Sequence, residues 1–214
     1  MWEEESCFWG VEHFFRKHFT GKGLLDARVG YIGGDTAHPT YRSVCAGKTG
    51  RTYLSAPPPP LSPANITKDA EALQILYNPS EVTYERLLEF FFQMHDPTTV
   101  DRQGPDVGSQ YRSAIFFHND QQEKAARRVL EKAQEQWYKV DMATQVIPAG
   151  EWWDAEDYHQ LYLDNSEFSN PALGCSMGER GRMVLTTGWQ TREAMSVLRS
   201  KFPIIPLFAC RKRG

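Results

Sequence analysis

Residues 70–94, AEALQILYNPSEVTYERLLEFFFQM, place a strand directly before an amphipathic helix. The apolar run over 70–77 predicts the strand, and the periodicity of residues 82–94 predicts the helix. The residues expected on the core face of that helix are Leu87, Leu88, Phe90, Phe91 and Met94. A strand that needs cover and a helix with one apolar face favour a sheet packed under helices.

The pattern of strands and helices continues on both sides of this stretch. The elements we expect, in chain order, are a helix over 8–19, a strand over 27–33, a short helix over 40–46, a loop over 98–110, a strand over 111–117, a long helix over 120–138 with Asn119 as its N-cap, a strand over 143–147 and a helix over 155–164. Beyond residue 165, no clear element is expected until 191–200. The irregular alternation favours an α/β fold of the α+β kind, with a single mixed sheet covered by helices.

Composition excludes several classes of protein. The chain has 214 residues, of which 41% are hydrophobic and 24% charged, and its net charge is −3. These values suit one globular domain and give no basic excess for nucleic acid. No apolar run approaches the roughly 20 residues that span a bilayer. The acidic start, Met1–Glu5, is unlike a secretory signal, so we expect a cytoplasmic protein, or a mitochondrial one if the N-terminus is incomplete.

The cysteines single out one candidate nucleophile. They stand at positions 7, 45, 175 and 210, and no CxxC pair indicates a zinc ribbon or a disulfide scaffold. Cys7 comes immediately before the first expected helix, where the helix dipole and free N–H groups lower the pKa of a thiol. Phe8 and Trp9 follow it and would form an aromatic wall. A thiol of low pKa beside an aromatic wall suits attack on a small, fairly apolar electrophile. The alternative is that Cys7 is a buried structural cysteine.

Eight short motifs in the sequence, taken in order, resemble those of a known family. They are CFWG at 7–10, GYIGG at 30–34, PTY at 39–41, GKTG at 47–50, AEA at 70–72, HDPT at 95–98, DVGSQYRS at 106–113 and EDYHQ at 156–160. In this order they resemble the A-type peptide methionine sulfoxide reductases, from about residue 6 to residue 165. The resemblance implies the ferredoxin-like fold of that family. It also implies reduction of the S epimer of methionine sulfoxide, free or in proteins, without metal or cofactor.

The resemblance assigns the central chemistry to two residues. Cys7 would attack the sulfoxide sulfur, and Glu71 would act as the general acid for the sulfoxide oxygen. Cys7 would then become a sulfenic acid. Because Glu71 must keep its proton near neutral pH, its surroundings should be apolar.

Five further residues receive supporting roles from the resemblance. Tyr41 and Tyr111 would donate hydroxyl hydrogen bonds to the sulfoxide oxygen, and Asp106 would hold a polar or water contact. Phe8 and Trp9 would receive the substrate methyl group. The alternatives are amphipathic surface or interface positions for the tyrosines and a turn position for Asp106.

Two histidines in these motifs are expected to be structural. We expect His95 to close a helix rather than to take part in chemistry. We expect His159 to occupy a hydrogen-bonded structural position rather than to act as a catalyst.

A second thiol is needed to complete the cycle. It would condense with the sulfenic acid to a disulfide that thioredoxin reduces. Cys175 and Cys210 are the candidates, although neither lies in a family-like context, and Cys45 is expected to pack within its own element. The expected partners are thioredoxin and oxidised proteins or free methionine sulfoxide, and we expect a monomer.

A proline-rich stretch interrupts the family pattern. Residues 51–68, RTYLSAPPPPLSPANITK, separate Gly50 from Asp69-Ala70-Glu71, whereas the family runs directly through Gly-His-Ala-Glu. If Arg51 is encoded by CGT, the stretch has the ends of a short intron, and its removal restores that His. Residues 51–68 are therefore either a translated intron or a genuine loop beside Glu71.

The two ends of the chain also depart from the family. Ser6 stands where the family usually has a glycine, and the acidic residues before it make a poor strand, so we expect the sheet to lack a member. We place the reductase domain at 1–165, interrupted by 51–68, with an unmatched tail at 166–214. These departures leave as the main alternative an impaired homologue that only binds methionine sulfoxide or a partner. A third reading, a general thiol-binding module unrelated to repair, has only the cysteine in its favour.

Overall fold

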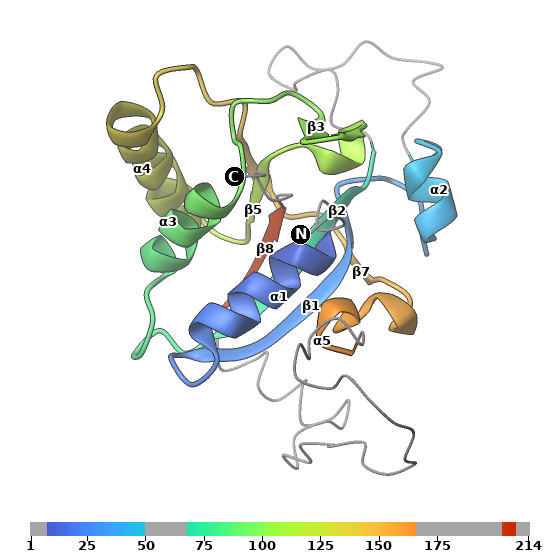
Figure 1. The fold of residues 1–214 in the computed structure, drawn as a ribbon, viewed down its shortest axis with the longest axis horizontal. Coiled ribbons are helices and arrows are strands. Elements are labelled where there is room, and N and C mark those ends of the chain that lie inside the picture. Colours follow the sequence, from blue (N-terminus) through green and yellow to red (C-terminus); the bar gives the residue numbers. More distant parts are fainter. Residues whose placement is uncertain (1–7, 50–67, 166–202, 209–214) are drawn as a thin grey trace, which may run out of the picture.

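A computed structural model describes residues 8–49, 68–165 and 203–208. Helices lie against a mixed sheet in this part of the chain (Figure 1). The helices are α1 (Phe8–Phe19), α2 (Tyr41–Cys45), α3 (Tyr84–Met94), α4 (Asp120–Trp137) and α5 (Tyr162–Asn165), with 3-10 turns η1 (Ser109–Tyr111) and η2 (Asp157–His159). The strands are β1 (Leu24–Ile32), β2 (Ala70–Tyr77), β3 (Arg102–Gln103), β4 (Asp106–Val107), β5 (Ala114–Phe117), β6 (Gln145–Pro148), β7 (Trp152–Asp154) and β8 (Ile204–Phe208).

Six of the strands form one sheet in the order β6-β5-β8-β2-β1-β7. The pair β5 and β6 is parallel, and the other neighbours are antiparallel. Strands β3 and β4 form a separate two-stranded ribbon. The expectation of a mixed sheet covered by helices is therefore confirmed.

Strand β2 is buried along its whole length. Leu73 and Ile75 belong to the larger hydrophobic cluster, and Ala70 and Ala72 belong to a smaller one. Since side chains alternate along a strand, these two sets lie on opposite faces. Glu71 shares the face of Leu73, so its carboxyl lies on the side of the larger cluster.

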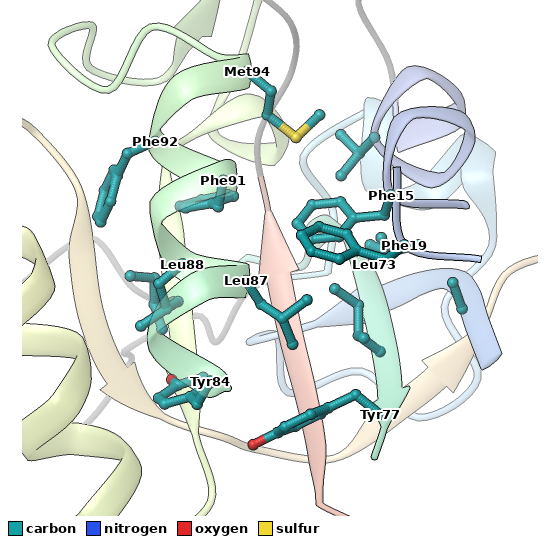
Figure 2. Close-up of a cluster of buried hydrophobic side chains, with 14 of the residues drawn as sticks. Phe15, Phe19, Leu73, Tyr77, Tyr84, Leu87, Leu88, Phe91, Phe92 and Met94 are labelled. Atoms are coloured by element: carbon teal, nitrogen blue, oxygen red, sulfur yellow. The ribbon is translucent and has the colours of Figure 1, made fainter. Parts of the chain in front are cut away.

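The larger cluster is formed between the sheet and helices α1, α3 and α4. Figure 2 shows how α3 contributes to it: Leu87 and Phe91 extend toward Phe15, Phe19 and Leu73. On α1 the buried apolar side chains are Phe8, Val11, Phe15 and Phe19.

The core face of α3 differs from the expected one at one position. Phe92 is fully buried, whereas Phe90 is only partly buried and stacks on His18, with 4.5 Å between ring centroids. The helix packs on α4 as well as on α1 and the sheet, so its apolar face is wider than a single stripe.

Most expected elements are confirmed, and the differences have local causes. The helix over 8–19, the strand over 70–77 and the Asn119 N-cap are found as predicted. The strand expected over 111–117 begins at Ala114, because the 3-10 turn η1 precedes it. The helix expected over 155–164 is divided into η2 and α5, because Leu161 adopts φ of 54° between them.

Two strands of the sheet escaped prediction. Strand β7 contains only three residues, and β8 follows a long stretch without a sequence signal. The expectation that the sheet lacks a member concerned residues 1–6, which lie outside the described residues. The proline-rich stretch and the expected element over 191–200 lie outside them too, apart from Lys68.

Strand β8 joins the two halves of the sheet. It pairs with β2 through Leu73↔Leu207 and with β5 through Ile115↔Leu207. Along the described residues, β2 and β5 are linked in the hydrogen-bonded order only through this strand. No helix in the described part of the chain is both long enough and apolar enough to cross a membrane.

Removing β8 should destabilise the protein strongly. Deletion of residues 203–214 exposes the backbone edges of β2 and β5, and at about 1 kcal/mol per lost hydrogen bond the expected loss is on the order of 5 kcal/mol. Denaturant unfolding measures it. Deletion of residues 209–214 alone is the matched control, and equal stability of the two truncated chains would contradict the role of β8.

His95 closes α3 and connects it to β5. It is the C-cap residue, as predicted, and is 1% exposed. Its Nδ1 lies 2.6 Å from the Phe91 carbonyl oxygen, and its Nε2 lies 2.8 Å from Ser113 Oγ. Burial lowers the pKa of His95 to about 4, against the opposing effects of the Phe91 hydrogen bond and the Asp96 charge.

This shift predicts a pH dependence of stability. Neutral His95 stabilises the fold fully above the unfolded pKa of about 6.5, and that contribution is lost as the pH falls toward 4. We expect the difference in unfolding free energy between the wild type and His95→Gln to shrink by on the order of 3 kcal/mol between pH 7 and pH 4. Urea unfolding at several pH values measures this. A constant difference would contradict it.

Candidate active site

Glu71 lies at the beginning of β2, directly opposite Tyr31 on β1. Both side chains are 0% exposed. Residues that pair across antiparallel strands point to the same face, so the Glu71 carboxyl and the Tyr31 ring adjoin each other in the larger cluster. Burial of a carboxyl disfavours its charged form, which suits a residue that must donate a proton.

A second carboxyl, Glu156, lies on the other side of Tyr31. The Tyr31 hydroxyl donates to Glu156 Oε2 over 2.8 Å, and the Tyr41 backbone N–H donates to Oε1 over 3.0 Å. Partial burial of Glu156 raises its pKa. The opposing effects are larger in sum: hydrogen bonds from Tyr41, from the backbone of Glu156 itself and from Tyr31, together with the interaction with His159, hold the pKa of Glu156 below its usual value. Burial, with the adjacent Glu156, also raises the pKa of Tyr31 far above its usual range.

The two carboxyls therefore lie in different surroundings. Glu71 is fully buried, whereas Glu156 is partly exposed and receives hydrogen bonds that stabilise its charge. Such a pair, separated by environment, is typical of sites where one group supplies a proton and the other keeps its charge. The site thus combines a buried acid with a fixed carboxylate.

His159 connects this carboxylate to the aromatic wall. Trp9 Nε1 donates to His159 Nδ1 over 2.9 Å, and because an indole N–H only donates, the proton of neutral His159 is on Nε2. This Nε2 lies 3.8 Å from Glu156 Oε2 and makes no hydrogen bond. Burial lowers the pKa of His159, although Glu156 opposes the shift. The expected hydrogen bond of His159 is confirmed, and its structural role stays a prediction.

Aromatic rings surround His159 on several sides. The ring centroid of His159 lies 5.1 Å from that of Phe8 and 4.8 Å from that of Tyr41. Trp9 stacks on Tyr162 with 3.6 Å between centroids and 14° between planes. The structure therefore brings Phe8, Trp9 and Tyr41 together, as the sequence predicted.

Glu12 fixes the segment that carries His159. Its side chain lies on the buried face of α1 and is 1% exposed. The carboxylate accepts a hydrogen bond from the Leu161 backbone N–H over 2.8 Å and another from Arg16 Nε over 3.0 Å. It thereby connects α1 to the turn after η2. Sequence reasoning missed this residue, although an acidic side chain among the apolar positions of residues 8–19 was a visible signal.

Two of the predicted site residues lie on a neighbouring segment. Tyr111 is the last residue of η1 and packs against the smaller cluster. Asp106 is partly buried in β4, where it pairs with Gln103. Their roles toward the sulfoxide oxygen stay predictions.

Of the four cysteines, the described residues include Cys45. Cys7, Cys175 and Cys210 lie outside them. Cys45 does not pack within its element as expected but is exposed, because Val44 is the residue of the short helix α2 that enters the core. Partial burial of its thiol raises the pKa of Cys45, the Tyr41 hydrogen bond opposes this, and the charges of Glu71 and Glu156 add to it.

Comparisons with known proteins give the family of the chain and agree with the fold. The peptide methionine sulfoxide reductase family matches residues 5–53 and 63–183. The chain is 45% identical over 163 residues to "Probable peptide methionine sulfoxide reductase" of Schizosaccharomyces pombe, which covers 75% of this chain and 85% of the relative. It is 42% identical over 173 residues to "Peptide methionine sulfoxide reductase MsrA" of Methanothermobacter thermautotrophicus, covering 79% and 86%.

Solved structures give the same result. The fold is similar to reduced Mxr1 of Saccharomyces cerevisiae, with a TM-score of 0.62, 38% identity and coverage of 79% of this chain and 84% of that one. It is also similar to methionine sulfoxide reductase A of Corynebacterium diphtheriae, with a TM-score of 0.61, 31% identity and coverage of 82% and 80%. The chain belongs to the peptide methionine sulfoxide reductase family.

The hydrogen bonds of Glu156 predict the effect of removing its charge. Glu156→Gln keeps the shape of the side chain but weakens the bonds from Tyr31 and Tyr41. Since hydrogen bonds to charged groups contribute about 1.5–3 kcal/mol, we expect a loss of about 2 kcal/mol in unfolding free energy and faster exchange of the Tyr41 amide. Glu85→Gln, on an exposed ion pair, is the control. Equal losses in both variants would contradict the prediction.

Proposed function

We propose that this chain reduces the S epimer of methionine sulfoxide, free or in proteins, with Cys7 as nucleophile and Glu71 as proton donor. The observation that carries the proposal is the fully buried Glu71 carboxyl, which adjoins Tyr31 in the cluster that also contains Phe8, the residue bonded to Cys7. The family of the chain supports methionine sulfoxide reduction. It gives no support to the alternative of an impaired homologue.

In the first step the Cys7 sulfur attacks the sulfoxide sulfur. Glu71 delivers a proton to the sulfoxide oxygen, whose negative charge grows as the S–O bond weakens. The oxygen then passes to the Cys7 sulfur, which becomes a sulfenic acid, and methionine leaves. The net reaction converts a thiol and a sulfoxide into a sulfenic acid and a thioether, so oxygen and protons balance.

The surrounding residues orient the substrate in this proposal. The partly buried Tyr41, whose backbone is held by Glu156, directs its hydroxyl to the sulfoxide oxygen together with Tyr111. Phe8 and Trp9 receive the methyl group. Asp106 holds a polar or water contact.

Regeneration requires a second thiol and an external reductant. A thiol from Cys175 or Cys210 condenses with the sulfenic acid, releasing water and forming a disulfide that thioredoxin reduces. The proposal also includes that the chain acts as a monomer in the cytoplasm. Neither a metal nor an organic cofactor takes part in this chemistry.

Turnover with separate epimers tests the function directly. The full chain is incubated with dithiothreitol and peptides that contain either the S or the R epimer of methionine sulfoxide, beside Cys7→Ser. We expect turnover of the S epimer only, and none in Cys7→Ser. Equal rates with both epimers, binding without turnover, or an active Cys7→Ser would contradict the proposal.

Replacing Glu71 tests its role as the acid. Glu71→Gln keeps the volume but supplies no acidic proton, and since general acid catalysis contributes about 100-fold to 10,000-fold, we expect kcat to fall by at least about 100-fold. Tyr41→Phe removes a hydrogen-bond donor and should cost about 10-fold. Steady-state kinetics measures both, and a Glu71→Gln rate within about 3-fold of wild type would exclude the assignment.

A further inference from the structure

The described residues on either side of the proline-rich segment meet in the fold. Asp69 N donates to Thr49 Oγ1 over 3.0 Å, and Gly34 N donates to Asp69 Oδ1 over 2.9 Å. Thr49 is 0% exposed and Asp69 is 2% exposed. The two described residues that flank this segment, Thr49 and Asp69, therefore meet at one buried place, two residues before Glu71.

Arg112 connects this place to the turn that carries Tyr111. Its Nη2 donates to the Lys68 carbonyl oxygen over 3.1 Å, and its Nη1 donates to the Ser109 carbonyl oxygen over 2.7 Å. One guanidinium thus bridges the start of the strand that holds Glu71 and the 3-10 turn that ends at Tyr111. At 3% exposure it is a buried cation.

Asp69 supplies negative charge to this buried arginine. Burial lowers the pKa of Arg112 to about 10, and the carboxylates of Asp101 and Asp69 oppose the shift. Burial likewise raises the pKa of Asp69, whereas hydrogen bonds from Gly34 and Thr49 and the charge of Arg112 lower it. Its Oδ2 is buried and makes no hydrogen bond, so the carboxyl interacts with Arg112 through charge.

The glycine pair Gly33-Gly34 shows how closely these groups approach the backbone. A Cβ on Gly33 would lie 2.9 Å from Arg112 Nη2, and a Cβ on Gly34 would lie 2.5 Å from Asp69 Oδ2. Gly33 also adopts φ of 100°, which side chains rarely tolerate. The end of β1 therefore has room for Arg112 and Asp69 only because both positions are glycine.

We propose that Arg112 and Asp69 are positioning residues that hold Glu71 and Tyr111 in one fixed relation and shield both from the proline-rich segment. This inference rests on the proposed function. A displacement of about 1 Å at a catalytic group can cost on the order of 100-fold in rate, which makes such a restraint valuable beside an insertion.

Two conservative variants separate positioning from general stability. Arg112→Lys keeps the positive charge but lacks the planar fork that places separate nitrogens on the two carbonyl oxygens, and Asp69→Asn keeps an acceptor for Gly34 but loses the charge. In each variant we expect kcat to fall at least about 10-fold while KM changes less than about 2-fold, because the aromatic wall of Phe8 and Trp9, which would receive the substrate, is unchanged. Arg128→Lys, on an exposed ion pair, is the matched control and should retain wild-type kinetics.

Shortening the inserted segment tests the shielding. Deleting residues 53–65 should change kcat less than about 3-fold in the wild type but more than about 10-fold in Arg112→Lys, because only the variant transmits the change to Glu71. Faster amide exchange at Glu71 and Tyr111 in Arg112→Lys reports the same loss independently of turnover.

The outcomes that overturn this proposal differ from those that overturn the function. Wild-type turnover of the S epimer tests the function by itself. Wild-type kcat and amide exchange in both conservative variants, or a loss of kcat that matches only the unfolded fraction seen by circular dichroism, would overturn the positioning role. A fall of more than about 10-fold on deleting residues 53–65 from the wild type would overturn the shielding.

Discussion

The structure depends on a carboxyl group at the start of a strand that is buried on both faces. Strand β2 has no exposed residue, and it carries Glu71 into the apolar side of the sheet. Placing a carboxyl there costs free energy unless it stays neutral or finds partners. Because burial disfavours the charged form of a carboxyl, the burial of β2 and the proposed role of Glu71 as an acid have one physical cause.

The rest of the site keeps this arrangement stable and directional. Glu156 holds Tyr31 and Tyr41 by hydrogen bonds to its carboxylate. His159 accepts a hydrogen bond from Trp9 and lies beside Glu156, so the aromatic side chains are fixed relative to the carboxylate. These contacts join residues that are far apart in the sequence.

Much of the fold was predictable because its signals are local. The helix over 8–19, the strand over 70–77 and the Asn119 cap follow from periodicity and side-chain chemistry within a few residues. The two missed strands have no comparable signal. Strand β7 is too short to show a pattern in the sequence. Strand β8 forms by hydrogen bonding to β2 and β5, and both of these strands are far from it along the chain.

The sequence by itself determined the family and singled out the nucleophile and the acid to be tested, since both depend on residue types in order. It could not show that Tyr31 pairs with Glu71, that Glu156 binds Tyr41, or that Glu12 enters the core to hold Leu161. It also could not show that Arg112 joins the flank of the insertion to the turn before Tyr111. These contacts join residues that are distant along the chain, and protonation states follow from burial, so only the tertiary structure decides them.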